Sequence, residues 1–144
     1  MIEPTDWTDI FFEKSSNEIV DDMLKNPNSP LKGSSIIGVY MISAALAARC
    51  GISPLREFKR EVNTTNKNLI TEEMQWLMSM IYYTLDPEKN LEKLKDKRAV
   101  IRTFEQYAQA GLTRLSEMCK DVTCYDELKR YVSQMAENEH ATIA

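Results

Sequence analysis

The stretch from Ile36 to Cys50 constrains the fold of this chain more than any other part of it. Wound into a helix, it presents apolar side chains on nearly all sides, so other elements must enclose it. Its length of about 15 residues falls short of the roughly 20 that span a bilayer. Ser34 or Ser35 can cap its start, and Gly51 can end it in a left-handed conformation. The stretch is therefore predicted to form a buried central helix.

The segments on either side have the apolar spacing of amphipathic helices. Long helices are predicted at about residues 5–25, 71–85 and 97–120, and shorter ones after Ser53-Pro54, after Asp86-Pro87 and from Thr123. The segment 97–120 has the most regular pattern, with an apolar stripe and a glycine for close helix contact: Ile101, Phe104, Ala108, Leu112, Leu115 and Gly111. No window combines strand alternation with a hairpin turn, so no sheet is predicted.

Together these patterns predict an all-α fold over residues 1–144. The 144-residue length suits one domain, and 43% hydrophobic residues can form a single core. We expect a bundle of about five to seven helices around the central apolar helix at about 35–50, with the last few residues frayed.

Charge and cysteine content indicate the compartment. Three cysteines are an odd number without zinc-site spacing, which is typical of reduced thiols in the cytoplasm. The N-terminus carries acids where an export signal would carry basic residues. A net charge of −4 and a pI near 5.1 disfavour nucleic acid as the default partner. We therefore expect a cytoplasmic protein that does not associate with membranes.

The residue types that most catalytic centres need are missing or badly placed. The single histidine, His140, lies near the C-terminus, where a preorganised base for a serine or cysteine nucleophile is not expected. Glu137 and His140 have the Glu-x-x-His spacing of helical di-iron sites, but such sites need a second pair. Phosphate-binding glycine loops are absent. We predict no catalytic residues, no metal ligands and no cofactor.

Acidic pairs leave one catalytic alternative open. Asp21-Asp22 and Glu72-Glu73 are adjacent pairs, and adjacent side chains on a helix point about 100° apart, so neither pair forms a site alone. Acids from two helices can still combine around magnesium. A carboxylate-metal hydrolase therefore remains an alternative function.

Adaptable apolar side chains favour a binding function. The chain has eight methionines and six tyrosines, and several of them lie off the main inward stripes. The candidate partner-binding residues are Met41, Trp76, Met80, Tyr82 and Tyr83. We predict a non-catalytic protein-protein interaction module that self-associates or serves as a small subunit or adaptor of a larger assembly. The competing interpretation is that methionine fills gaps in an irregular core.

A basic segment supplies a further alternative. The candidate nucleic-acid-binding residues are Lys89, Lys93, Lys97, Arg98 and Arg102, diluted by nearby acids. A second basic group lies between Arg56 and Arg60. The competing interpretation of the basic segment is a solvated helix face with ion pairs at a spacing of four residues.

Overall fold

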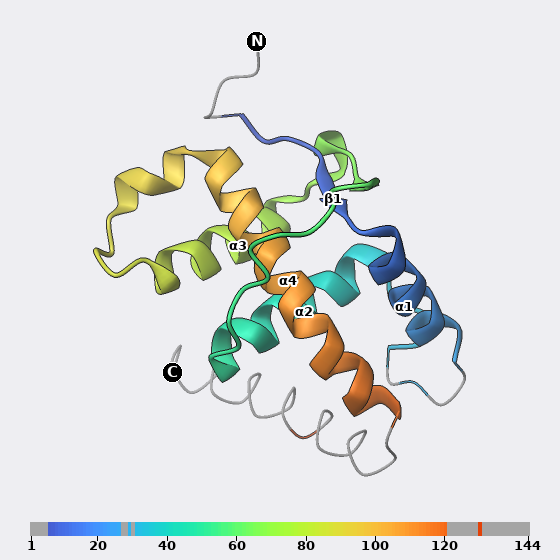
Figure 1. Cartoon of the computed structure of the whole chain (residues 1–144). Coiled ribbons are helices and arrows are strands. Elements are labelled where there is room, and N and C mark those ends of the chain that lie inside the picture. Colours follow the sequence, from blue (N-terminus) through green and yellow to red (C-terminus); the bar gives the residue numbers. More distant parts are fainter. Residues whose placement is uncertain (1–5, 27–28, 30, 121–129, 131–144) are drawn as a thin grey trace.

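The computed structural model describes residues 6–26, 29, 31–120 and 130 (Figure 1). This part is mostly helical, with one small antiparallel sheet. The α-helices are α1 (Lys14–Lys25), α2 (Ile36–Cys50), α3 (Glu72–Leu85) and α4 (Lys97–Lys120); the strands are β1 (Ile10–Phe12) and β2 (Val62–Thr65); the 3-10 helices are η1 (Lys67–Leu69) and η2 (Leu91–Lys95). Four α-helices in the described residues do not confirm the predicted five to seven. The helix predicted from Thr123 lies outside the described residues.

The predicted central helix is confirmed. Ser35 accepts a hydrogen bond from the Gly38 amide at 3.0 Å, and Gly51 ends α2 at a φ of 68°. Figure 1 shows α4 crossing α2, and this crossing is the largest contact between helices. A Cβ atom placed on Gly111 of α4 would lie 2.0 Å from the carbonyl oxygen of Ser43 in α2. The two backbones therefore touch where glycine leaves no side chain between them.

The prediction of one helix over residues 5–25, and of no sheet, is wrong. Residues 10–12 form β1, which pairs antiparallel with β2, and helix α1 begins only at Lys14. Ile10 and Phe12 are fully buried while Phe11 is only half-buried, which is the two-residue period of a strand. Phe12 stacks on Tyr40 of α2, with 3.6 Å between the ring centroids. Burial in the core therefore outweighs the helical spacing of this segment.

The helix predicted after Ser53-Pro54 is also absent. Residues 52–61 form an extended segment that runs from the end of α2 across α4 toward β1 (Figure 1). The Leu55 amide donates to the carbonyl oxygen of Gln106 at 3.0 Å, and the Glu61 amide donates to that of Phe12 at 3.2 Å. The Leu55 side chain is 43% exposed. Tertiary hydrogen bonds replace the helical ones that the proline signal predicted.

Helix α3 begins as the sequence predicts, because the Thr71 hydroxyl accepts a hydrogen bond from the Met74 amide at 3.3 Å. The helix predicted after Asp86-Pro87 is instead a turn followed by the 3-10 helix η2, which ends at Lys95. Among the described residues, no helix has both the length and the apolar character needed to cross a membrane.

Candidate functional site

The exposed face of α3 carries two of the five predicted partner-binding residues. Trp76 is 64% exposed and Met80 is 54% exposed, and they lie one helical turn apart. Met41 and Tyr82 are half-buried and pack against the core instead. Tyr83 is half-buried beneath Lys89, whose ammonium lies 5.7 Å from the ring centroid. We call Trp76 and Met80 the α3 face.

An open groove of about 440 Å³ lies beside Trp76. Its apolar walls are Trp7, Trp76 and Leu94, and its polar lining is Glu72, Gln75, Ser79 and Lys97. Lys97 was predicted to contact phosphates, but its ammonium lies 5.0 Å from the Trp7 ring centroid and donates to the Leu94 carbonyl at 2.8 Å. Trp7 lies before β1 in a stretch that forms no helix, contrary to the predicted helix over residues 5–25, and it lines this groove.

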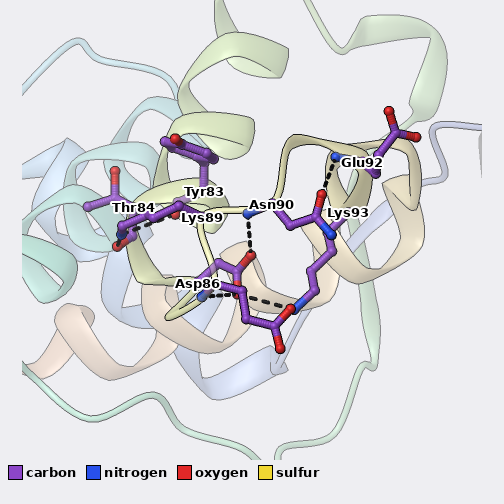
Figure 2. Close-up of polar contacts among 8 residues, drawn as sticks. Tyr83, Thr84, Asp86, Lys89, Asn90, Glu92 and Lys93 are labelled. Atoms are coloured by element: carbon purple, nitrogen blue, oxygen red, sulfur yellow. Dashed lines mark hydrogen bonds and ion pairs between the residues drawn. The ribbon is translucent and has the colours of Figure 1, made fainter.

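Two other predicted phosphate ligands are engaged within the turn after α3. Figure 2 shows Lys93 directed at Asp86, with 3.2 Å between Nζ and Oδ1, and Lys93 also pairs with Glu88 at 3.1 Å. Lys89 donates to the carbonyl oxygens of Tyr83 and Thr84 at the end of α3. Both ammonium groups therefore stabilise the turn, as positive charge does at a helix C-terminus.

Asp86 organises this turn. Its carboxylate accepts hydrogen bonds from the backbone amides of Asn90 at 3.0 Å and Glu88 at 3.1 Å, in addition to the Lys93 contact (Figure 2). The Asn90 amide, followed by the Glu88 amide and Lys93, lowers the pKa of Asp86 below its ordinary value. The charged form of Asp86 is therefore the form that the folded turn stabilises.

This pKa shift predicts a contribution to stability that acid removes. A carboxyl group whose pKa is lower in the folded than in the unfolded chain stabilises the fold above its unfolded pKa of about 3.9, and the contribution disappears as the pH falls through the folded pKa. We expect Asp86→Asn to lower the unfolding midpoint in urea at neutral pH and to flatten the acid dependence below about pH 4. Asp22→Asn, at an exposed position of α1, is the matched control. Parallel acid profiles for wild type and Asp86→Asn would contradict the prediction.

The two remaining predicted phosphate ligands, both arginines, lie together near the start of α4. Arg98 and Arg102, one turn apart on α4, line a hollow of about 290 Å³ with Arg60 of the extended segment. Thr8, Asp9 and Phe11, around the start of β1, complete its lining. We call this the arginine hollow. The basic segment is thus divided between the turn, the groove and the hollow.

Sequence reasoning missed the buried carboxylate behind this hollow. Glu105 of α4 is 0% exposed and accepts hydrogen bonds from the Phe11 amide at 2.9 Å and from Arg60 at 2.8 and 2.9 Å. The available signal was its position, because Glu105 is the charged residue within the apolar stripe of Ile101 and Ala108. Its partner Arg60 gave no signal, since it lies in a segment without apolar periodicity.

The described part of the chain does not bring the acidic candidates together into a metal site. Within it, no three histidine, cysteine, aspartate or glutamate side chains are placed to hold a metal ion. Glu137 and His140 lie outside it. No family model, no curated protein and no solved structure matches the chain.

Proposed function

We propose that this protein is a non-catalytic interaction module that self-associates through the α3 face. The observation that carries the proposal is the pair Trp76 and Met80, exposed on adjacent turns beside a groove with apolar walls. Tryptophan and methionine are enriched in protein interfaces and adapt well to a facing surface. An exposed pair of this kind next to a groove offers both a projecting side chain and a recess to receive one.

Burial of the α3 face would contribute substantially to the free energy of association. Covering a largely exposed tryptophan removes on the order of 150 Å² from water, which contributes about 4 kcal/mol before the entropy cost of association. Tryptophan is also among the side chains that dominate binding energy when they sit at the centre of an interface. Trp76 is therefore the expected anchor.

The charges at the two ends of α3 favour a second copy of the chain as the occupant. Glu72 and Glu73 lie in its first turn, whereas Lys89 covers its last carbonyl groups. In an antiparallel pair of α3 helices, Trp76 of one copy packs beside Met80 of the other, and acids at each start approach Lys89 at each end. The same surface is then self-complementary, as a two-fold interface requires.

Self-association is tested by sedimentation velocity over a range of protein concentrations. Trp76→Ala should weaken dimer formation roughly 30-fold, as expected for an interface anchor. Met80→Lys should also weaken it, because the substitution places a charge in the apolar centre. Leu55→Lys is the matched control, since Leu55 is an exposed apolar residue away from the α3 face. A wild-type protein that stays monomeric up to high micromolar concentration would contradict the proposal.

A charge exchange tests the antiparallel arrangement of the two α3 helices. Glu73→Lys and Lys89→Glu should each weaken the dimer, and the double variant should restore it, because the exchanged charges again face opposite charges. The melting temperature of each variant, measured where the wild type is monomeric, controls for damage to the end of α3. Weakening without restoration would show that Glu73 and Lys89 do not face each other across the dimer, and would contradict the antiparallel arrangement.

A further inference from the structure

The arginine hollow joins residues that are far apart in the sequence. Arg98 and Arg102 come from α4, Arg60 comes from the extended segment, and β1 closes the hollow with Phe11. Guanidinium groups match the geometry of phosphate oxygens better than other side chains do. We propose that the arginine hollow binds the phosphate group of a small phosphorylated ligand. This site is separate from the α3 face.

Arg60 is held in place before any ligand arrives. Its Nε and one Nη donate to the two oxygens of Glu105, and its Cζ lies 4.8 Å from the centroid of the Phe11 ring. A guanidinium group has five N–H donors, and only two are used by this pair. Because its rotamer is already fixed, Arg60 loses little side-chain entropy when its remaining donors meet a phosphate.

The balance of charge at the hollow favours an anion. Three arginines line it, whereas the carboxylates at or behind its lining are Asp9 and Glu105. Both oxygens of Asp9 accept hydrogen bonds from other groups, the Lys67 amide at 2.7 Å and the Asn63 side chain at 3.0 Å. Arg102 is exposed and lies one turn from Arg98, so it can approach the same phosphate.

The size of the hollow and the contacts of the predicted lysine ligands favour a small ligand over a nucleic acid. A nucleic-acid surface requires several cations that follow a phosphate backbone. The other predicted phosphate ligands do not supply such a row, because Lys89 and Lys93 are engaged in the turn and Lys97 is engaged at Trp7. The hollow of about 290 Å³ is suited to one phosphate or diphosphate group.

The test uses pyrophosphate and inorganic phosphate as probes, at constant ionic strength maintained with sodium chloride. We expect pyrophosphate to raise the melting temperature of the full chain and to give a measurable Kd by titration calorimetry. Arg102→Gln should raise that Kd roughly tenfold, since hydrogen bonds to charged groups are among the stronger ones. Arg98 is already engaged in an interaction of its own, so Arg102 is the cleaner position for this variant.

Arg114→Gln provides the matched control, because Arg114 is an exposed arginine on the same helix but away from the hollow. Unchanged affinity in this variant, together with weakened affinity in Arg102→Gln, supports the site. Equal effects of the two substitutions, or a wild type that responds to pyrophosphate no more than to sodium chloride, overturns it. A single-stranded oligonucleotide without terminal phosphate that binds more tightly than pyrophosphate would also overturn it, in favour of nucleic acid.

Discussion

Gly111→Ala is expected to destabilise the protein by about 3 kcal/mol, although alanine is the better helix former by nearly 1 kcal/mol. The new methyl group would lie 2.0 Å from the Ser43 carbonyl oxygen and 3.2 Å from the Ala47 Cβ. Backbone atoms cannot rotate away as a side chain can, so α2 and α4 must separate and lose contact along their crossing. Chemical denaturation followed by circular dichroism measures the loss as a lower midpoint.

Gly38→Ala is the matched control for this prediction. A methyl group there would lie 2.9 Å from the Ser35 hydroxyl oxygen, which belongs to a side chain that can move. The gain in helix propensity and the disturbed cap oppose each other, so the net change should stay within about 1 kcal/mol. Equal stability changes in the two variants would show that the α2–α4 crossing tolerates a methyl group and that the close contact at Gly111 is unimportant.

The elements that could be predicted from the sequence are those whose signals are local. The start and end of α2 follow from Ser35 and Gly51, which act within one turn of the helix. The start of α3 follows from Thr71 in the same way. Helix α4 has enough turns for its apolar stripe to be unambiguous over 24 residues. In each case the residues that determine the element lie inside it or next to it.

The elements that were missed depend on distant partners. Strand β1 has three residues, too few to display alternation, and it exists because β2 pairs with it from about fifty residues away. Ser53-Pro54 has the local form of a helix start, but the Leu55 amide bonds to Gln106 of α4 instead. The sequence of β1 does not indicate that β2 will pair with it, and the sequence after Ser53-Pro54 does not indicate a bond to Gln106. Strand β1 shortens the first predicted helix, whereas the predicted helix count falls short after Ser53-Pro54 and again after Asp86-Pro87, where a turn and η2 replace the α-helix.

The candidate sites also differ in whether local sequence or distant contacts determine them. Trp76 and Met80 were predicted from their spacing on α3, which fixes the face on which they lie. The arginine hollow was not predicted, because Arg60 reaches Arg98 and Arg102 only through the path of the extended segment. Lys89 and Lys93 looked equivalent to Arg102 in the sequence, and only the turn around Asp86 distinguishes them.

The ion pair between the partly exposed Arg60 and the fully buried Glu105 carries the second large prediction. Among the described residues, Arg60→Met leaves a fully buried carboxylate with the Phe11 amide as its one remaining donor, and Glu105→Met leaves that amide and the guanidinium without this acceptor. Breaking one side of a buried pair costs about 3–5 kcal/mol, whereas replacing both sides with apolar residues is often far less costly.

We therefore expect each single variant to lose about 3 kcal/mol or more of unfolding free energy, and the double Met variant to lose much less than their sum. The double-mutant cycle is measured by urea denaturation. Arg114 and Glu117, on the same helix, supply the control cycle, because their side chains are 57% and 64% exposed and 3.9 Å apart. Their coupling should stay below about 0.5 kcal/mol, since water screens an exposed pair. A coupling energy for Arg60 and Glu105 no larger than that for Arg114 and Glu117 would contradict this prediction. The packing of Phe12, rather than the carboxylate of Glu105, would then attach β1 and the extended segment to α4.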